Sequence, residues 1–353
     1  MNPRSLVLGG SVFVGRRLVD ALVAAGHDVT ILNRGVTPVE LPPGVGALRA
    51  DRTKPEQVAE ALGGSEWDSV FDVSGFVMAA GGVDVDSFLD VFESRTGCYL
   101  YVSSIMAYDQ GLLGLFPWRE DMATNPSGPS SYGGFKAVVE EALLSRARSG
   151  RLPGAVVRPA AIYGPHNNIY DMETAMWLRL AGRRPVLIPH SGLVTASYGH
   201  VDDLCEAMIA LSRCASAVGE VFNVTTSAIT VNRYVETLAA IVGVDPNVVE
   251  IPDDTLAELP TAPFGHLFGR AHHAVLSTVK LEEALPQLQP RSFERGHAET
   301  YEWFISMGWD RLDAPLADPV WRSSWDFAWE AQVAKRVRAS NDRHSSQTGA
   351  TLS

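Results

Sequence analysis

Three side chains in the middle of the chain have the residue types and the spacing for proton transfer. Tyr132 and Lys136 are four residues apart in a helical pattern, so they share one face of the expected helix. A phenol titrates near pH 10, and a neighbouring ammonium favours the phenolate and lowers the pKa of the phenol. Ser103 and Ser104 follow an expected strand at 99–102, where a serine hydroxyl could hold the reacting oxygen. The alternative is an exposed tyrosine–lysine pair and two turn serines.

A glycine-rich turn near the N-terminus predicts a dinucleotide site. An apolar run at 6–8 predicts a buried strand, Gly9 and Gly10 interrupt it, and apolar residues at helical spacing follow over 13–23. This order places a pyrophosphate at a helix N-terminus, where backbone N–H groups meet the positive end of the helix dipole. We expect Gly15 to let the helix pack closely against the strand. Val12 replaces the middle glycine of the usual pattern, and an ordinary strand-to-helix turn is the alternative.

The residues after the second and third expected strands, at 29–32 and 47–50, indicate the type of cofactor. Neutral Asn33 and cationic Arg34 stand where a carboxylate would accept the ribose hydroxyls of NAD(H). An arginine pairs with the 2′-phosphate of NADP(H), so we favour NADP(H), with NAD(H) as the alternative. Arg34 could instead stack on the adenine or remain solvated. Asp51 and Arg52 follow the third strand and are candidates to contact the adenine.

Alternating strand and helix patterns predict an α/β fold built on a doubly wound parallel sheet. A chain of 353 residues is longer than one core usually serves, so we expect a smaller C-terminal α/β substrate lobe. The predicted boundaries are 1–165 for the dinucleotide-binding domain, with 194–224 returning to it, and 166–310 for most of the substrate lobe. Trp321, Trp325, Trp329 and Val333 recur every four residues and predict an amphipathic helix over 311–340, before a polar, disordered tail at 341–353.

The composition narrows the classes of molecule that this chain is expected to bind. A net charge of -12 argues against binding to nucleic acids or anionic membranes. No apolar run is long enough to span a bilayer, and the chain begins directly with a strand pattern, so we expect a cytoplasmic protein. The three cysteines lack metal-ligand spacing, and His266, His272 and His273 have no carboxylate at such a spacing. We therefore expect no metal site.

Together these motifs resemble the extended short-chain dehydrogenase/reductase superfamily, in its NAD(P)-dependent epimerase/dehydratase branch. The resemblance spans about residues 5–308 in the family's order, and its motifs are Gly9–Gly15, Asp51, Ser104, Tyr132-Gly-Gly-Phe-Lys136, Arg158–Pro165, His200–Leu204 and Asn223-Val224. It implies that Tyr132 is the acid/base. It also implies that Lys136 holds the nicotinamide ribose and lowers the tyrosine pKa, and that Ser104, rather than Ser103, orients the substrate oxygen.

The resemblance and the turn positions together give two sets of candidate binding residues. The candidate cofactor contacts are Gly9, Gly10, Ser11, Val12, Phe13, Val14, Gly15, Asn33, Arg34, Asp51, Arg52, Val73, Ser74, Gly75, Val102, Pro159, Ala160, Ala161 and Ile162. The candidate substrate contacts are Phe76, Met106, His166, Asn167, Tyr198, Arg270 and His272.

The resemblance implies an epimerase or reductase acting on a hydroxyl or keto carbon of a nucleotide-diphosphate sugar. Ile105 and Met106 stand where dehydratases often carry an acidic pair, which counts against a 4,6-dehydratase. A ketoreductase acting on a specialised-metabolite ring is the alternative enzyme. A binding or regulatory protein with a vestigial cofactor site, as in the similar chloroplast stem-loop RNA-binding proteins, is the alternative of another class. The intact Ser104, Tyr132 and Lys136 count against it. A homodimer is compatible with the resemblance, because this superfamily often pairs subunits through a four-helix contact.

Overall fold

The structure is a computed structural model that describes residues 2–36, 40–73, 82, 84–112, 114–168, 172–259, 268, 271–308 and 326–350, with backbone only over 341–350. It divides into two compact units. The first unit comprises Met1–Asn168, Ser197–Ser227 and Val275–Arg291. The second comprises Ile169–Ala196, Ala228–Ala274 and Ser292–Ser353.

The first unit contains a seven-stranded sheet in which every paired strand is parallel, with the order β10-β6-β5-β4-β1-β2-β3. Its strands are β1 (Arg4–Leu8), β2 (Asp28–Asn33), β3 (Gly46–Arg49), β4 (Trp67–Asp72), β5 (Thr96–Val102), β6 (Gly154–Pro159) and β10 (Val221–Val224). This confirms the predicted doubly wound fold. The strand order reverses beside β1, so β1 and β4 flank the crevice where such sheets bind ligands.

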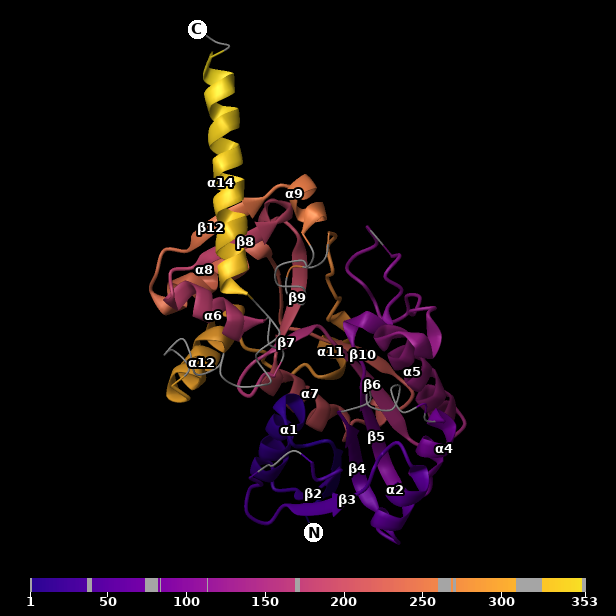
Figure 1. The fold of residues 1–353 in the computed structure, drawn as a ribbon. Helices are drawn as coiled ribbons and strands as arrows, with labels where there is room; N and C mark the ends of the chain where they lie inside the picture. Colours follow the sequence, from indigo (N-terminus) through magenta and orange to yellow (C-terminus); the bar gives the residue numbers. More distant parts are fainter. Residues whose placement is uncertain are drawn as a thin grey trace. The chain divides into compact units, whose positions relative to one another are not determined.

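Helices cover both faces of this sheet (Figure 1). α1 (Phe13–Ala24) packs against α7 (Val201–Leu211). α2 (Pro55–Leu62), α4 (Val85–Asp90) and α5 (Tyr132–Arg148) bury Val58, Phe88 and Val139 in one shared core cluster. Because both faces are covered, the strands carry nearly continuous apolar runs, and Leu6, Val7 and Leu8 are at most 1% exposed.

The remaining elements of the first unit are short. They are η1 (Ile105–Ala107), η2 (Gly128–Ser130), β7 (Ala161–Tyr163), η4 (Ala215–Ala217) and α11 (Val279–Ala284). β9 (Thr195–His200) and β11 (Ser227–Thr230) include residues of both units. The sequence assigned 275–291 to the substrate lobe, whereas the structure groups it with the first unit. The reason is long-range hydrogen bonding, because Trp118 N–H donates to the Val275 carbonyl and Ser277 N–H donates to the Trp118 carbonyl.

The second unit is smaller and contains a two-stranded parallel sheet. Its elements are α6 (Glu173–Ala181), β8 (Pro185–Pro189), η3 (His190–Gly192), α8 (Val231–Val242), β12 (Asn247–Ile251), α9 (Asp253–Glu258), α12 (Phe293–Ser306) and α14 (Phe327–Ala350). β12 pairs with β8, and α14 covers both strands with Val333, Ala334 and Val337. A buried ion pair between Arg179 of α6 and Glu330 anchors the start of α14.

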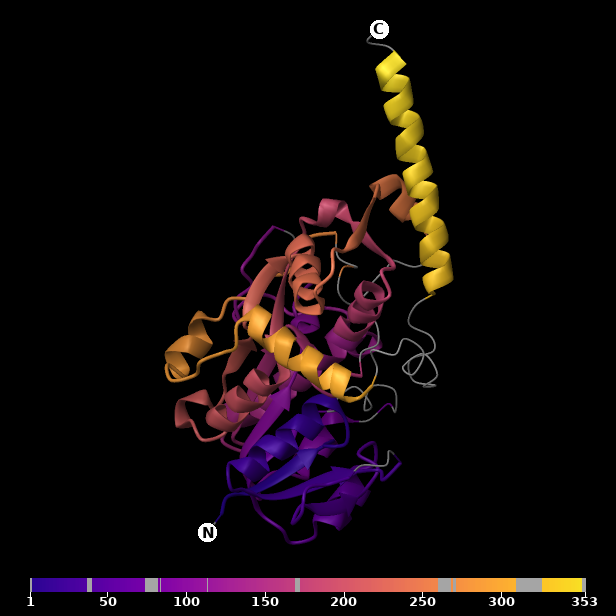
Figure 2. The same cartoon turned by 90° about the vertical axis from the view of Figure 1, so that its left-hand side faces the viewer.

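The C-terminal helix differs from its predicted bounds. α14 continues to Ala350, through most of the segment predicted as a disordered tail, and Figure 2 shows it as one long rod. Trp321, Trp325 and the start of the predicted helix lie outside the described residues. For Trp329 and Val333 the predicted apolar stripe is confirmed, because both side chains pack in the same hydrophobic cluster.

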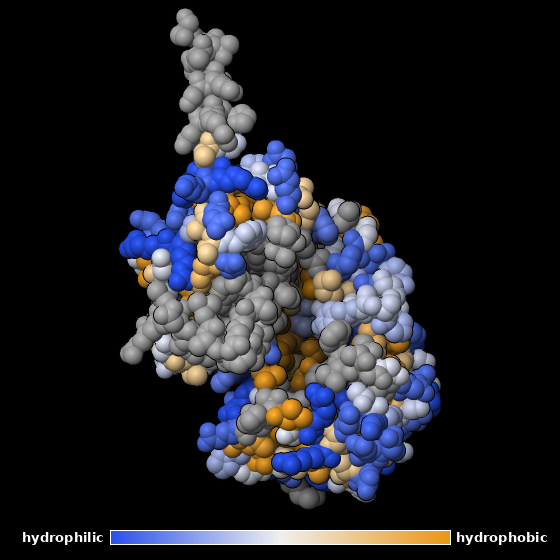
Figure 3. Space-filling model, viewed as in Figure 1, coloured by the Kyte–Doolittle hydropathy of each residue, from blue (hydrophilic) through white to orange (hydrophobic). Residues whose placement is uncertain are grey.

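The displayed face around α4 and α5 is largely hydrophilic (Figure 3), and Asp84, Asp86 and Asp90 of this region are exposed. Among the described helices, none combines the length and the apolarity needed to cross a bilayer.

Candidate functional site

Ser104 and Tyr132 meet at the carboxyl edge of the sheet. Ser104 follows β5, and its hydroxyl accepts a hydrogen bond from the Met106 N–H at 3.1 Å. Tyr132 is the first residue of α5, and its side chain is hydrogen-bonded to Ser104. A Cβ on Gly133 would lie 2.0 Å from the Met106 carbonyl oxygen. Only glycine therefore lets the first turn of α5 approach η1 this closely, which brings the phenol to the serine.

The structure distinguishes the two adjacent serines. Ser103 is 2% exposed, and its hydroxyl has no hydrogen-bond partner among the described residues. Its backbone N–H donates to the Val157 carbonyl within the sheet. Ser104, in contrast, contacts the phenol, and Tyr132 is 40% exposed, so a substrate can reach it. The geometry favours Ser104, as the resemblance implied.

Lys136 is buried beneath this pair. Its Nζ donates a hydrogen bond to the Val102 carbonyl oxygen at 2.7 Å. The same atom lies 4.8 Å from the ring centroid of Tyr101 and 5.7 Å from that of Tyr132. Burial disfavours its charged form and lowers the pKa of Lys136 to about 8.

The tyrosine pKa runs against the sequence-based expectation. Although Tyr132 is 40% exposed, the protein around the phenol removes part of its hydration, which disfavours the charged phenolate and raises the pKa of Tyr132. The hydrogen bond with Ser104 offsets only part of this rise. The physical reason is the direction of the lysine, whose ammonium is bonded to the Val102 carbonyl of β5. In this structure Tyr132 is therefore a neutral phenol at physiological pH.

The glycine turn has the geometry that an anion site needs. Gly9 and Gly10 have positive φ angles of 120° and 84°. A Cβ on Gly15 would lie 2.5 Å from the Gly10 backbone nitrogen and 3.1 Å from Val73 Cγ2. Gly15 thus lets α1 lie directly on the turn, as predicted.

The N-terminus of α1 completes this site. Val12 occupies the N-cap in an extended conformation, is 48% exposed, and has no side-chain hydrogen bond to the first turn. The N–H groups of this turn are therefore left for an anionic ligand. Phe13 is buried with a φ of 37°, and the Val14 carbonyl faces Cys205 Sγ at 3.9 Å.

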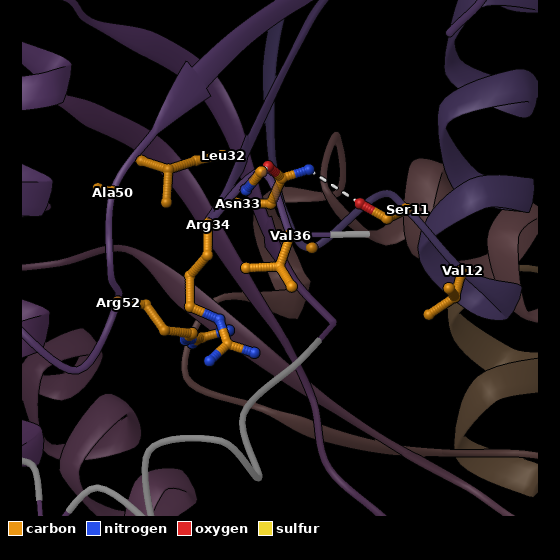
Figure 4. A pocket seen from close by; sticks show the side chains of 10 residues that line it. Ser11, Val12, Leu32, Asn33, Arg34, Val36, Ala50 and Arg52 are labelled. Carbon is orange, nitrogen blue, oxygen red and sulfur yellow. Dashed lines mark hydrogen bonds between the residues drawn. The ribbon is translucent and has the colours of Figure 1, made fainter. Parts of the chain in front are cut away.

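A pocket opens beside the turn, at the end of β2 (Figure 4). It is lined by Gly9, Ser11, Val12, Leu32, Asn33, Arg34, Gly35, Val36, Ala50 and Arg52. Asn33 Nδ2 donates to Ser11 Oγ at 2.8 Å, and Gly35 N–H donates to Asn33 Oδ1 at 2.8 Å. Asn33 thereby links the two turns that border the pocket. Arg34 is exposed, and its side chain extends on the same side of the pocket as Arg52 (Figure 4).

Asp51 and Arg52 are engaged with protein groups. Asp51 Oδ1 accepts hydrogen bonds from the N–H and hydroxyl of Thr53, which lowers the pKa of Asp51. Arg52 Nη2 bonds both carboxylate oxygens of Asp72 at 2.8 and 2.7 Å. The predicted adenine contacts of Asp51 and Arg52 stay predictions. Arg52 lines the pocket, but it is buried and its guanidinium is bound to a strand carboxylate that the local sequence pattern did not reveal.

The other cofactor candidates are mostly backbone positions at strand ends. The Val73 N–H donates to the Leu8 carbonyl, and the Ala160 N–H donates to the Val224 carbonyl. Pro159 ends β6, while Ala161 and Ile162 begin β7 opposite Tyr198 and Gly199 of β9. Ser74 and Gly75 lie outside the described residues.

The predicted substrate contacts fall in different places. Met106 lies in η1 beside Ser104. His166 follows β7 with a φ of 67°, and burial together with Arg17 and Arg16 lowers its pKa. Asn167 and Tyr198 are buried at 3% and 1% exposure, and their substrate contacts stay predictions. His272 belongs to the second unit, and Phe76 and Arg270 lie outside the described residues.

Sequence reasoning missed one polar residue of the sheet edge. Asp72 ends β4, is 1% exposed, and accepts hydrogen bonds from Arg52 and from the Tyr99 hydroxyl at 2.8 Å. The available signal was a carboxylate inside the apolar run 70–73. Across the described part of the chain, no three His, Cys, Asp or Glu side chains are grouped to hold a metal ion.

The arrangement fits a dinucleotide and an adjacent carbonyl or hydroxyl group. The family model of the NAD dependent epimerase/dehydratase family matches residues 5–225. The chain belongs to this family. The match contains the glycine turn, Ser104, Tyr132 and Lys136, and the family accounts for the parallel sheet described above.

Curated members similar to this chain have diverse names. The "2'-dehydrokanamycin reductase" of Streptomyces kanamyceticus is 31% identical over 59% of this chain and 57% of that protein. The "Chloroplast stem-loop binding protein of 41 kDa b, chloroplastic" of Arabidopsis thaliana is 29% identical over 62% of this chain and 58% of that protein. The chain thus spans less than two thirds of either relative. The "UDP-glucose 4-epimerase" of Mycolicibacterium smegmatis is 26% identical over 85% of this chain and 98% of that protein.

Solved structures share the family fold. A UDP-glucose 4-epimerase of Thermotoga maritima, determined with UDP-glucose, superposes with a TM-score of 0.70 at 23% identity. It covers 86% of this chain and 99% of that chain. A dTDP-glucose 4,6-dehydratase of Bacillus anthracis, in complex with NAD, has a TM-score of 0.70 at 17% identity, over 86% of this chain and 97% of that chain.

Proposed function

We propose that this chain is an NADP(H)-dependent reductase or epimerase that acts on a keto or hydroxyl carbon of a nucleotide-diphosphate sugar. The observation that carries the proposal is the hydrogen bond between Ser104 and the exposed, neutral phenol of Tyr132 at the edge of the dinucleotide-binding sheet. The proposal is for the activity of the whole protein, and a homodimer and a cytoplasmic location stay predictions.

Tyr132 acts as the general acid in the reductive direction. The Ser104 hydroxyl holds the substrate carbonyl oxygen beside the phenol, and the Tyr132 O–H donates its proton to that oxygen. A bound nicotinamide supplies the hydride for the carbon, or accepts one in the reverse direction. In that reverse direction the phenolate of Tyr132 takes the hydroxyl proton. The raised pKa of Tyr132 favours the acid role at neutral pH, because the phenol stays protonated.

NADP(H) is the cofactor that the pocket at the end of β2 suits better. Asn33 has a neutral amide engaged with Ser11 and Gly35, so no carboxylate of β2 repels a 2′-phosphate there. Arg34 lines the same pocket and is exposed. Its guanidinium can therefore turn to a phosphate and bind it through two donors.

The names of relatives support the nucleotide-sugar class. The "UDP-glucose 4-epimerase" of M. smegmatis matches over 98% of its own length. Among solved structures of this fold, one contains UDP-glucose and another contains UDP-glucose and NAD. We extend this substrate class to the chain as a proposal.

A ketoreductase acting on a specialised-metabolite ring is the second candidate. It is favoured by the 31% identity to a protein named 2'-dehydrokanamycin reductase. Both candidate functions give Ser104 and Tyr132 the same roles. They differ in the substrate group that the substrate lobe must bind. A substrate panel therefore separates them.

The deciding experiment compares wild type with Tyr132→Phe. Turnover is followed with UDP-glucose and UDP-N-acetylglucosamine for epimerisation, and with NADPH and a 2'-dehydrokanamycin ketone for reduction. We expect Tyr132→Phe to lower turnover by about 10²- to 10⁴-fold, because it removes the proton donor. NADPH binding should remain. Tyr301→Phe, which removes a hydroxyl from an aromatic cluster with Trp177 and Phe304, is the matched control and should keep its turnover. Full turnover in Tyr132→Phe would overturn the catalytic proposal.

A titration of NADPH and NADH tests the cofactor. We expect wild type to bind NADPH more tightly and Arg34→Ala to lose about tenfold or more of that affinity, because charge-assisted hydrogen bonds contribute about 1.5–3 kcal/mol. NADH affinity should change little. Arg148→Ala removes an exposed arginine paired with Glu141 and is the control. Equal affinities of wild type for the two dinucleotides would refute the preference for NADP(H).

A further inference from the structure

Lys136 has an unusual charge environment for a catalytic lysine. It is 4% exposed, and its Nζ is placed between the Val102 carbonyl and the faces of Tyr101 and Tyr132. A carbonyl and aromatic rings stabilise an ammonium only in part, and an uncompensated buried charge is costly. A nearby carboxylate is therefore needed to keep the lysine protonated.

Two buried ion pairs carry charges that act on the lysine. Glu140 of α5 is bound by Arg158 of β6, with Nη2 and Oε2 2.6 Å apart. Asp72 of β4 is bound by Arg52 through both carboxylate oxygens. Each arginine balances one carboxylate, so Lys136 is the additional cation of this buried group.

Asp72 is well placed to act on the lysine. It stands directly opposite Tyr101 in the register of β4 and β5, and the Tyr101 ring carries the Lys136 ammonium on its face. Tyr99, on the same side of β5 as Tyr101, donates its hydroxyl to Asp72 Oδ2 at 2.8 Å. Arg52 and Tyr99 together fix the carboxylate at this point of the sheet.

We infer that Asp72 is a positioning residue of the candidate active site, whose carboxylate, fixed by Arg52 and Tyr99, keeps Lys136 in its ammonium form. The inference rests on the proposed function for its catalytic consequence, because in that function the cationic lysine is the group that would bind a ribose hydroxyl of the dinucleotide. The inference gives the Arg52–Asp72 ion pair a role in the charge state of Lys136, in addition to its role in the stability of the fold.

The electrostatics of the individual groups agree with this assignment. Around Lys136, burial lowers its pKa most, Asp72 raises it, Arg52 lowers it, and Glu140 raises it. The effect of Asp72 exceeds the opposing effect of Arg52, so removing both charges should still lower the lysine pKa. The pKa of Asp72 is itself lowered, because the charges of Arg52 and Lys136 and the Tyr99 hydrogen bond outweigh its burial.

The test observes the lysine directly and needs no substrate. The chain has four lysines, Lys54, Lys136, Lys280 and Lys335, so NMR of the full chain with ¹³Cε-labelled lysine gives four resonances, and Lys136→Met identifies the relevant one. In wild type the Lys136 signal should titrate with a midpoint of about 8. In Asp72→Asn the midpoint should fall by about one pH unit or more, because an opposite charge close by has been removed.

A double variant and a matched control keep the test decisive. Arg52→Gln/Asp72→Asn removes the arginine together with its carboxylate and leaves no unpaired Arg52, so it should fold even if Asp72→Asn does not, and its midpoint should lie between those of Asp72→Asn and wild type. Asp203→Asn changes another carboxylate paired with an arginine, Arg291, and should leave the Lys136 midpoint unchanged. An unchanged midpoint in the folded double variant would overturn the inference.

The outcome also separates this inference from the proposed function. If turnover survives Tyr132→Phe, the proposed function fails, whatever the lysine titration shows. If wild type turns over and the midpoint of Lys136 does not respond to Asp72, the inference fails alone. If the proposed function and the inference both hold, turnover of the double variant should decline at a lower pH than turnover of wild type. The NMR midpoint of Lys136 should shift in the same direction.

Discussion

Lys136 donates a hydrogen bond from its Nζ to the backbone carbonyl oxygen of Val102, 2.7 Å away. The contact joins α5 to the end of β5, the strand that also leads to Ser104. It holds the ammonium below the tyrosine ring, while the phenol is bonded to Ser104. The lysine and the tyrosine share one helix face, as their spacing predicts, but in this structure each contacts a different group of the sheet edge.

The first prediction concerns stability as a function of pH. The pKa of Lys136 is about 8 in the folded protein and near its ordinary 10.5 when unfolded. Below pH 8 both states hold the proton and the cost of burying the charge is fully present. Between pH 8 and 10.5 the unfolded state binds more protons, so this residue makes stability rise with pH. Over this pH range the free energy of unfolding of wild type, measured with urea, should rise by up to about 3 kcal/mol relative to that of Lys136→Met. A constant difference between the two proteins would contradict the assignment.

The second prediction distinguishes the adjacent serines. Ser104→Ala removes the hydroxyl bonded to Tyr132 and should lower kcat by about 10²-fold or more, the usual cost of losing one donor to a reacting oxygen. Ser103→Ala removes a buried hydroxyl that has no partner among the described residues, so kcat should be retained. Steady-state kinetics with the substrate found in the panel provides the measurement. Equal losses in both variants would show that Ser104 has no special role.

The third prediction concerns the glycine turn. In Gly15→Ala the new Cβ would lie 2.5 Å from the Gly10 nitrogen, so α1 must move away from the turn. We expect a loss of about 1–3 kcal/mol in the free energy of unfolding, together with weaker NADPH binding. Gly64→Ala has no atom within 4 Å of its new Cβ and should change stability by less than about 0.5 kcal/mol. Denaturant unfolding and dinucleotide titration measure both effects, and wild-type NADPH affinity in Gly15→Ala would speak against this site.

The fourth prediction concerns the second unit, where α14 is attached to α6. Arg179 Nε donates to Glu330 Oε2 at 2.8 Å, and both side chains are buried. Glu330→Leu leaves a buried arginine without its carboxylate and should cost about 3–5 kcal/mol. Arg179→Met/Glu330→Leu removes both charges and should recover most of that loss. Thermal unfolding of the two variants tests this, and a single variant as stable as the double would exclude an anchoring role for the ion pair.

Local sequence patterns predicted the parts of the site that depend on short-range order. The parallel sheet follows from apolar runs alternating with helical periodicity, and the glycine turn follows from Gly9, Gly10 and Gly15. The Ser104–Tyr132 contact was implied by the family resemblance. The acidity of Tyr132 was predicted with the wrong sign, because spacing along a helix shows which residues share a face and does not show which atom a flexible ammonium contacts.

The amino-acid sequence by itself determined the fold class and the candidate residues for proton transfer, because periodicity, turn residues and motif order are local properties of the chain. Only the tertiary structure decided that Arg52 binds Asp72, that Asp72 stands opposite Tyr101, and that Lys136 lies buried above that ring. These contacts join residues of β4, β5 and α5 with Arg52 from the turn that precedes α2. Their energies depend on burial and on the balance of charges in a low-dielectric interior, which no local pattern of residues encodes.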